Sequence, residues 1–502
     1  MSDIPGQSEI GASASTLAPR VVRGGLWVAL ASYSSIGFGF VANLALTRIL
    51  GPEAFGIIAL ASFFSSLINL RPKSGVNQAF ARQPEVSGAL TGTHLALDMG
   101  AGVLTVALAA VAVPLLVAFG YSPSVAWAVL ALAAIGVLDS VTGTAWVLLD
   151  RELRFRDSSL VSVVAFPLSY LPAFWLALRG AGYWSLLAQA GTYSLLLLAG
   201  MWWMARRRLP HIWQLEWHFD GQVARSLLRF GIVVGAATMA GLFLTQFDNF
   251  LVGTFVGVAT LGFYDRAYRI AQWPSALVTS VVNRTAFYTY ARVQDDPARL
   301  HKSVTMALWL ITSLALPLAL AIFAAAPDLV ALLYGSRWLP AVPFVRFLVA
   351  YSLLRPVLDL MGSLFVAVGR PKRATAVSGV QALTLAIVAT PLTLAWGAVG
   401  TCVGVGVAFG AGLVAAYRYL RRTVEVSLYS VLAAPAAAAA IALGTYWLVG
   451  QSGAIAALPL VARVLAKGGL VVGTFVAAML ACEGRTTLQR SRYIWRLLHP
   501  AS

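Results

Sequence analysis

Long apolar stretches joined by short polar connections run along most of the sequence. Each stretch is about 20 residues long, which is the length that an α-helix needs to cross the hydrocarbon core of a bilayer. The strands of a transmembrane barrel would instead alternate apolar and polar residues over about ten positions, and these stretches do not alternate. The pattern therefore predicts an all-α polytopic membrane protein.

Fourteen of these stretches can be marked in the 502 residues. Turn signals separate many of them, as at Gly51-Pro52. Proline inside a stretch is tolerated because neighbouring helices can satisfy the freed carbonyl, and Pro356 predicts a kink at its position. The predicted spans cover residues 24–47, 53–71, 89–119, 124–149, 158–178, 182–204, 228–252, 258–291, 301–325, 341–368, 373–394, 397–420, 427–449 and 460–482.

Charged residues are scarce in this chain. Lys and Arg number 36, Asp and Glu number 19, and charged side chains make up 11% of the sequence, whereas soluble proteins carry about 25%. This deficit excludes an ordinary cytoplasmic enzyme. The formal net charge is nevertheless +17, which leaves nucleic acid, anionic lipid, an anionic substrate or membrane topology as explanations.

The positions of the basic residues favour topology as the main explanation. Of the 36, 27 are assigned to the termini and to the connections after every second span, including the span ends beside them, and four to the alternate connections. Because cytoplasmic loops carry the Lys and Arg excess, both termini are predicted to be cytoplasmic. The N-terminus lacks the features of a cleaved signal, so the first span is expected to be an uncleaved anchor. The other five basic residues fall inside predicted spans: Arg266, Arg269, Arg346, Arg355 and Lys467.

An internal repeat relates the two halves of the chain at an offset of 206 residues. The matched pairs include Arg23 with Arg229, Asn43 with Asn249, Gly51 with Gly257 and Gly56 with Gly262. Each copy holds six spans, so both copies enter the membrane in the same direction, as in transporters that rock two lobes about a central site. A rigid scaffold would also tolerate such a duplication, although charge inside the membrane favours transport.

The predicted domain organisation follows from this repeat. It comprises a cytoplasmic N-terminal tail (1–23), a first lobe with spans 1–6 (24–205), a cytoplasmic loop between the lobes (206–227), a second lobe with spans 7–12 (228–422), spans 13 and 14 (423–482) and a cytoplasmic C-terminal tail (483–502). Spans 13 and 14 lie outside the repeat and are an addition to it. The outward-facing connections are short, so no external domain is expected.

Span 8 opens with three charged side chains. Asp265 and Arg269 lie at i,i+4 on one helical face, and Arg266 lies beside Arg269 at i,i+3. At about 1.5 Å per residue the cluster lies roughly 10–15 Å from the outer surface, where a charge without a partner costs at least about 2.5–3.5 kcal/mol. One carboxylate offsets one guanidinium, and the second guanidinium could bind a phosphate bidentately. A structural ion pair, with the other arginine reaching the interface, is the alternative.

Span 10 carries a similar set of residues. Arg355 and Asp359 are again at i,i+4, and Arg346 lies nearer the outer end of the span. Binding of an anionic substrate and a purely structural ion pair are both open for this set.

Other polar residues of the spans are candidates to bind a coupling ion or the substrate. Asp248 in span 7 and Asp98 in span 3 could bind a proton or a sodium ion, or could pair with one of the arginines. Asn43 and Arg48 near the end of span 1 could line the substrate cavity, as could Asn249 at the equivalent place in the second copy.

Several familiar signatures are absent or have a simpler explanation. The glycines between Gly400 and Gly410 form two Gly-x-x-x-Gly pairs in apolar context, which predicts helix packing rather than a dinucleotide loop. His211 and His218 lack metal-ligand spacing, and the chain has no Walker sequence. The triple arginine 206–208 abuts the membrane and indicates topology or anionic lipid rather than nucleic acid. No metal, cofactor or nucleic acid is therefore expected.

Several short motifs resemble those of a known family. Residues 46–56, Leu-Thr-Arg-Ile-Leu-Gly-Pro-Glu-Ala-Phe-Gly, resemble the A-R-L-L-G-P-E-D-F-G turn of the polysaccharide flippase family, within the multidrug/oligosaccharidyl-lipid/polysaccharide exporter superfamily. Residues 151–156 are similar to its R-x-L-R-F-R loop and residues 180–185 to its G-x-G-x-W-S/A turn. In the second half, residues 227–231 and 261–269 resemble its L-L-R-F-G and L-G-x-Y-x-R-A-x-R motifs. The order and spacing of the motifs make the resemblance specific.

The resemblance implies fourteen helices in two lobes and a function in transport. Such a flippase moves a polyprenyl-pyrophosphate-linked oligosaccharide from the cytoplasmic to the periplasmic leaflet by alternating access, for biosynthesis or export of a cell-surface polysaccharide. The pyrophosphate would lie against Arg266, Arg269 and Arg355. The expected partners are the lipid-linked substrate, membrane lipids and the polysaccharide polymerase or export machinery, in the bacterial inner membrane.

Two alternatives stay open. A cation-coupled drug exporter of the same superfamily would share the fold, although the basic bias of this chain suits an anionic cargo better. A polyprenyl-dependent membrane glycosyltransferase or polymerase would need a substantial external loop, and the outer connections are short and nearly uncharged. We therefore expect transport rather than enzymatic chemistry.

Overall fold

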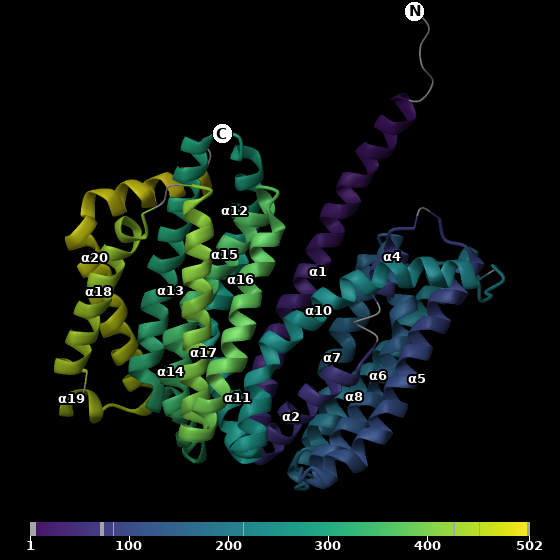
Figure 1. Ribbon diagram of the computed structural model, residues 1–502, viewed down its shortest axis with the longest axis horizontal. Coiled ribbons are helices and arrows are strands. Elements are labelled where there is room, and N and C mark those ends of the chain that lie inside the picture. The colour runs from purple at the N-terminus through teal and green to yellow at the C-terminus, as the bar shows by residue number, and fades with distance from the viewer. Residues whose placement is uncertain are drawn as a thin grey trace, which may run out of the picture. The chain divides into compact units, whose positions relative to one another are not determined.

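The structure of the protein is a computed structural model (Figure 1), which describes the backbone of residues 7–70, 75–83, 85–213, 215–424, 427–450 and 452–498. The regular structure of these residues is helical, and none of them forms a strand. Nine helical stretches within the described ranges are long and apolar enough to cross a membrane. The predicted class, an all-α polytopic membrane protein, is confirmed.

The chain divides into two compact units, Met1–Phe243 and Leu244–Ser502. The helices of the first unit are α1 (Gln7–Ile49), α2 (Pro52–Ile68), α4 (Val76–Ala81), α5 (Gly88–Ala118), α6 (Pro123–Arg151), α7 (Phe155–Leu178), α8 (Trp184–Arg208) and α9 (Pro210–Trp213). Within this unit α6 packs against α2, α5 and α8, and α7 packs against α1 and α8 (Figure 1). The boundary between the units falls within α10 (Gly221–Phe255).

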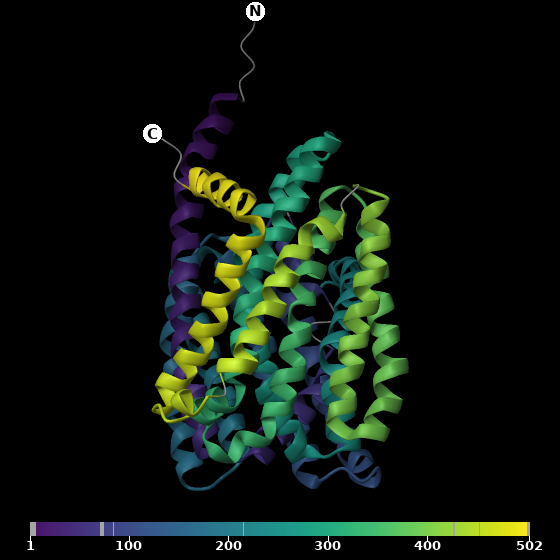
Figure 2. The same cartoon turned by 90° about the vertical axis from the view of Figure 1, so that its left-hand side faces the viewer.

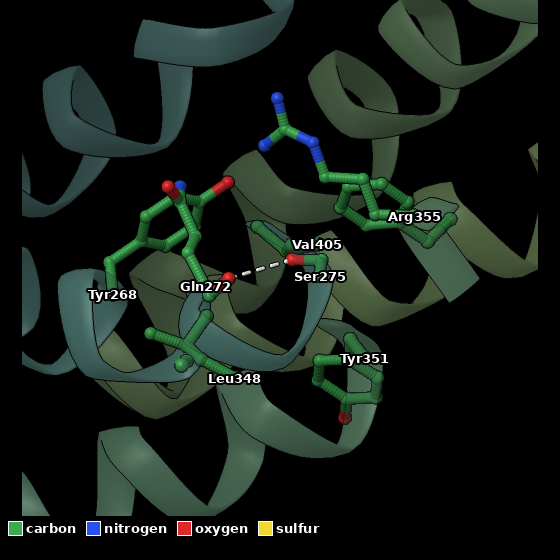
Figure 3. A pocket seen from close by; sticks show the side chains of 9 residues that line it. Tyr268, Gln272, Ser275, Leu348, Tyr351, Arg355 and Val405 are labelled. Carbon is green, nitrogen blue, oxygen red and sulfur yellow. Dashed lines mark hydrogen bonds between the residues drawn. The ribbon is translucent and has the colours of Figure 1, made fainter. Parts of the chain in front are cut away.

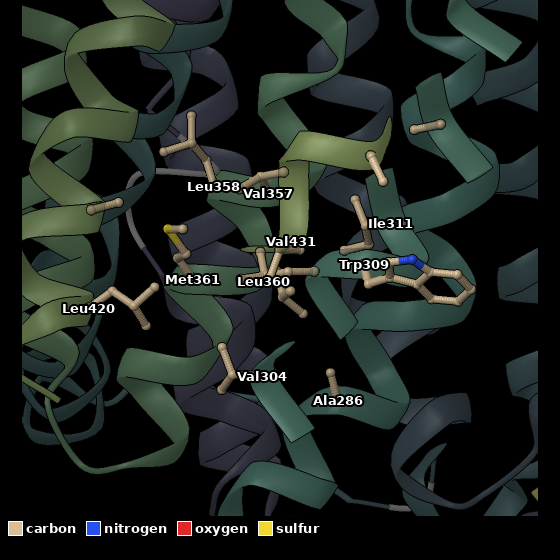
Figure 4. Packing of buried hydrophobic residues seen from close by; sticks show 14 of the residues in the cluster. Ala286, Val304, Trp309, Ile311, Val357, Leu358, Leu360, Met361, Leu420 and Val431 are labelled. Carbon is tan, nitrogen blue, oxygen red and sulfur yellow. The ribbon is translucent and has the colours of Figure 1, made fainter. Parts of the chain in front are cut away.

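The second unit is built around a long central helix, α13. Its elements are α11 (Val258–Ala271), α12 (Trp273–Val293), α13 (Pro297–Tyr334), the 3-10 helix η1 (Ser336–Ala341), α14 (Val342–Ser352), α15 (Leu354–Ala367), α16 (Pro371–Thr384), the π-helical turn η2 (Leu385–Ala389), α17 (Thr390–Arg421), α18 (Leu428–Val449), α19 (Gly453–Ala456) and α20 (Leu460–Leu498). α13 packs against α12, α14, α18 and α20. Trp309 and Ile311 of α13 share an apolar core with Met361 of α15 and Leu420 of α17 (Figure 4).

Proline coincides with breaks in two predicted spans of the second unit. The span 258–291 is divided into α11 and α12, with Pro274 in the first turn of α12. The span 341–368 is divided at Leu353 into α14 and α15, and Pro356 follows the break. Proline has no N–H to donate to the carbonyl four residues earlier, so the helical hydrogen-bond ladder is interrupted. The kink expected at Pro356 is confirmed.

The two ends of the chain contain more helix than predicted. α1 begins at Gln7, so most of the segment 1–23, which the sequence predicts to be a cytoplasmic tail, is helical. A helix that continues an existing span needs no new nucleus, and the alanines of this segment favour it. α20 extends to Leu498, with non-helical backbone at Glu483 (φ −135°) near the predicted end of the last span. Figure 2 shows α20 changing direction there.

Some expectations of the sequence fall outside the described residues. The basic residues Arg71 and Lys73 lie in the gap between residues 70 and 75, which includes the start of the predicted connection after the second span. Residues 1–6 and 499–502 lie outside the described ranges as well.

The predicted Gly-x-x-x-Gly packing occurs in α17. A Cβ on Gly404 would come within 2.5 Å of the Ala389 Cα in η2. A Cβ on Gly406 would collide with the Tyr351 ring of α14. Glycine therefore lets α17 approach two neighbouring elements more closely than any residue with a side chain would, as expected for helix packing.

A glycine also divides α17 near its start. Gly397 has a φ of 61°, a left-handed conformation that glycine adopts without strain. The helical segments on its two sides pack on each other, since the hydroxyl oxygens of Thr393 and Thr401 lie 2.8 Å apart. This turn lies at the start of the predicted span 397–420.

Lys467, which the sequence places inside a span, has a partner on a neighbouring helix. Its Nζ lies 2.6 Å from Oδ2 of Asp328 in α13, and Nε of Arg463 lies 3.3 Å from Oδ1 of the same residue. Asp328 is buried, so two cations one turn apart on α20 share one carboxylate. These contacts join α20 to α13 and explain Lys467 in structural terms.

The connection between α9 and α10 lies against the start of α5. The Glu216 backbone lies so close to Gly88 that no Cβ would fit there. The N–H of Asp220 donates a hydrogen bond to the hydroxyl of Thr93 (2.8 Å). The later part of the predicted loop 206–227 is therefore attached to the first unit.

We expect Gly404→Ala to lower the free energy of unfolding by about 1–3 kcal/mol, the usual effect of adding a methyl group where there is no room for it. Gly410→Ala is the matched control in the same helix, because nothing lies within 4 Å of a Cβ at Gly410. Thermal unfolding of both variants in one detergent compares them. Equal melting temperatures would contradict the packing described for Gly404.

Candidate functional site

The charged cluster of span 8 lies on α11, which begins directly after Gly257. The φ of Gly257 is 119°, which favours glycine at this turn. The cluster lies about 10 Å along the helix from its start. Arg266 Nη2 lies 2.8 Å and Arg269 Nε lies 3.1 Å from Oδ2 of Asp265. The structure thus brings the three candidate residues together on one carboxylate oxygen.

The two arginines of this cluster differ in exposure. Arg266 is 4% exposed, whereas the side chain of Arg269 is 59% exposed. Asp265 shares one negative charge between a buried and an exposed guanidinium, so the three side chains together carry a net charge of +1. Arg266 is placed to hold Asp265, and Arg269 is the arginine that a ligand can reach.

Asp248 has a tyrosine partner. It lies on α10 and is 5% exposed, and its Oδ2 accepts a hydrogen bond from the Tyr264 hydroxyl of α11 (2.9 Å). Its Oδ1 accepts a hydrogen bond from the N–H of Asn249 (2.9 Å). The ion pairs of the described residues do not include Asp248. Of the two predicted possibilities, pairing with an arginine is therefore not seen within those residues.

Arg355 lines a small cavity of the second unit (Figure 3). Tyr268, Gln272 and Tyr351 also line it. Figure 3 shows Tyr268 and Gln272 on the side of the Arg355 guanidinium, while the Tyr351 hydroxyl points away from it. The cavity measures about 20 Å³, which is enough for a water molecule and too small for a diphosphate.

The other two candidates of span 10 line different cavities. Asp359 lines one of about 480 Å³. Arg346 lines another of about 460 Å³ with Trp447 of α18, and its guanidinium carbon lies 5.5 Å from the ring centre of Phe323 in α13. The ion pairs of the described residues do not join Arg355 to Asp359. The predicted i,i+4 pair is therefore not formed in this structure, because the two side chains face separate cavities.

The candidates of the first unit have mainly structural surroundings. Asn43 of α1 donates a hydrogen bond from Nδ2 to the Tyr170 hydroxyl of α7 (3.0 Å), which joins the two helices. Arg48 is exposed in the last turn of α1. Asp98 is buried on α5. A contact of these residues with substrate stays a prediction.

The sequence reading missed two tyrosines of the site. Tyr264 and Tyr268 lie one turn apart on α11 and contribute to the Asp248 contact and to the Arg355 cavity, respectively. Their i,i+4 spacing beside the charged cluster was the available signal. Among the described residues no group of three or more His, Cys, Asp or Glu side chains could hold a metal ion.

A family model described as "Polysaccharide biosynthesis protein" matches residues 45–343, more than half of the chain. The chain belongs to the polysaccharide biosynthesis protein family. This confirms the family resemblance carried by the sequence motifs. The lipopolysaccharide biosynthesis protein WzxC of Escherichia coli (strain K12) is similar, with 23% identity over 362 residues and 71% of each chain covered. The succinoglycan biosynthesis transport protein ExoT of Rhizobium meliloti (strain 1021) is 27% identical over 335 residues, 66% of each chain.

Two solved structures show the fold of this polysaccharide biosynthesis protein. The lipid II flippase MurJ in an inward closed conformation matches with a TM-score of 0.71 at 13% identity, over 92% of this chain and all of that one. An inward-facing multidrug resistance MATE family transporter matches with a TM-score of 0.59 at 15% identity, over 76% of this chain and 93% of that one. At these identities the likeness concerns the fold alone, which is that of a polytopic helical membrane protein.

We expect Tyr264→Phe to lower the free energy of unfolding by about 1–3 kcal/mol, because it leaves the buried Asp248 without its hydroxyl donor. Tyr290→Phe is the matched control, since the Tyr290 hydroxyl is buried without a hydrogen-bond partner in the described part of the chain. Removal of the Tyr290 hydroxyl should change the free energy of unfolding little. Melting temperatures of the two variants measure the difference, and a Tyr264→Phe protein as stable as Tyr290→Phe would show that the hydroxyl does not stabilise Asp248.

Proposed function

We propose that the protein is a flippase that moves a polyprenyl-pyrophosphate-linked oligosaccharide from the cytoplasmic to the periplasmic leaflet of the bacterial inner membrane. Its family, its transporter fold and the names of its relatives support this function. The main barrier to such a movement is the desolvation of sugar and diphosphate in hydrocarbon. A polar path through the protein lowers this barrier, so no covalent step and no cofactor is required.

The observation that carries the proposal is the exposed Arg269 beside the shared carboxylate of Asp265. A guanidinium binds two oxygens of a phosphate group in parallel, and this geometry suits a diphosphate. In the proposed site Arg269 contacts the diphosphate, while Arg266 positions Asp265 and does not touch the substrate. Arg355 would join the contact only after its small cavity opens. Arg346, Arg48, Asn43 and Asn249 are further candidates to contact the glycan or the diphosphate.

The proposed working form has fourteen spans, in two lobes of six helices followed by α18 and α20, with both termini in the cytoplasm. The lobes would open alternately to the two sides of the membrane. An inside-negative potential favours outward movement of an anion by about 2.3 kcal/mol per charge per 100 mV. A dedicated coupling ion is therefore optional, and Asp248 or Asp98 would be its site. The polysaccharide polymerase or export machinery would receive the product.

Drug export coupled to a cation is the second candidate, because the fold also matches a multidrug resistance transporter. The net charge of +1 on the Asp265 cluster disfavours a cationic drug there. A membrane glycosyltransferase has less support, since ExoT is named a transport protein and MurJ a flippase.

Deletion of the gene should leave the lipid-linked oligosaccharide in the cytoplasmic leaflet and abolish the surface polysaccharide, because the glycan cannot cross the hydrocarbon unaided. The leaflet is determined from the access of a membrane-impermeant glycosidase to spheroplasts and to inverted vesicles. A normal leaflet distribution together with lost polymerisation would indicate a membrane enzyme instead.

Arg269→Ala should lower transport by at least about tenfold, the effect of losing a charge-assisted hydrogen bond to the diphosphate. The variant is tested by complementation of the deletion strain at matched protein levels. Arg299→Ala is the control, since Arg299 is exposed and paired only one turn away with Asp296; it should complement fully. Full complementation by Arg269→Ala would assign Arg269 to a structural pair.

A further inference from the structure

The cavity lined by Asp359 is formed by residues other than those of the proposed diphosphate site. Its volume of about 480 Å³ lies within the range of about 300–1,000 Å³ found for small-ligand pockets. Its lining includes four polar side chains of α15 and α16, Asp359, Ser363, Ser378 and Gln381, and the aromatic rings of Phe287 in α12 and Phe365 in α15. All of these residues belong to the second unit, so the cavity is formed by one part of the chain.

The side chain of Gln381 is held in place by a close helix contact. Gln381 lies on α16 and is 7% exposed. The backbone of α17 reaches it at Gly412, where any Cβ would collide with the Gln381 side chain. Because Gly412 has no side chain, α17 packs directly on Gln381, and the amide lies at the wall of the cavity, where it can donate two hydrogen bonds and accept others.

The carboxylate of Asp359 lies at the same cavity. It is exposed, and the ion pairs and hydrogen bonds of the described residues leave its oxygens to the cavity. A carboxylate within a spanning segment is costly unless it faces water or a polar ligand. Its position on the cavity wall therefore indicates that the cavity is polar when it is used.

This combination of groups suits the hydroxyls of a sugar. Each sugar hydroxyl both donates and accepts hydrogen bonds. The cavity offers the Asp359 carboxylate as an acceptor, the Gln381 amide as a donor and an acceptor, and the hydroxyls of Ser363 and Ser378. The Phe287 ring offers an apolar face to the C–H side of a pyranose.

Charge near the cavity argues against two other ligands. Arg355 lies one turn before Asp359 on α15, and Arg373 lies in the first turn of α16, where it donates a hydrogen bond to Thr423. The positive charges of Arg355 and Arg373 disfavour a cationic ligand in this cavity, and a cationic drug is such a ligand. A uronic acid would bring its own carboxylate against Asp359, which like-charge repulsion disfavours.

We propose that this cavity binds an uncharged sugar residue of the transported glycan, with Asp359 and Gln381 hydrogen-bonding its hydroxyls and Phe287 against its ring. This inference rests on the proposed function, because the sugar is taken to be part of the lipid-linked substrate. It adds a glycan site to the diphosphate contact at Arg269.

The test compares two lipids on the full chain in nanodiscs: undecaprenyl pyrophosphate without sugar, and the same lipid carrying one glucose. Wild-type protein should bind the glucosylated lipid roughly tenfold more tightly, the value of one hydrogen bond to a charged group. Asp359→Asn and Gln381→Leu should reduce this preference to about twofold or less and leave the affinity for the sugar-free lipid unchanged. Gly412→Ala, which displaces Gln381 without removing a polar atom, should do the same.

Three controls keep the outcomes distinct. Asp295→Asn and Gln294→Ala change the same side-chain types on the exposed connection after α12, and Gly410→Ala matches Gly412→Ala; all three should keep the wild-type preference. Folded variants that keep the full preference for glucose would overturn the sugar site and leave the flippase intact. Binding of tetraphenylphosphonium that Asp359→Asn abolishes would overturn it in favour of a cation site. Wild-type protein that binds neither lipid would contradict the flippase function itself.

Discussion

The structure depends on one constraint, the high cost of an ionisable side chain inside a spanning helix that has neither a partner nor water. Three buried or half-buried carboxylates of the second unit satisfy it in different ways. Asp328 is shared by two cations of α20, Asp265 is shared by two arginines of its own helix, and Asp248 is hydrogen-bonded by a tyrosine. Where both cations are largely buried the contact joins two helices, and where one is exposed the same arrangement leaves a positive charge at the protein surface.

Features that depend on nearby residues could be predicted from the sequence. The helical spans follow from the length of the apolar stretches, the break near Pro356 from a missing N–H, and the cluster around Asp265 from spacing within a single turn of helix. Contacts between distant segments could not be predicted, because no local pattern encodes them. Lys467 and Asp328 are 139 residues apart, and the tyrosine partner of Asp248 lies on the next helix.

Arg355 and Asp359 show why spacing alone can mislead. Residues at i,i+4 lie near each other on a helix, but contacts with other helices or with a cavity compete with the pair between them. Here each of the two faces its own cavity, where water or a polar ligand can replace the ion pair. An intact pair would have neutralised both groups, so their separation leaves one basic and one acidic position on α15, each at a different cavity.

The docking of the connection after α9 on α5 also bears on how the gene could be divided. Trp213 and Trp217 stack on each other with ring centres 4.9 Å apart, and Asp220 is hydrogen-bonded to Thr93. A two-fragment version of the protein, with each half expressed separately, should therefore be cut after Asp220 and not after Arg208. A cut after Arg208 would remove from the first fragment the segment that packs on Gly88. It would also leave Trp213 and Trp217 exposed near the start of the second fragment, where they would favour aggregation.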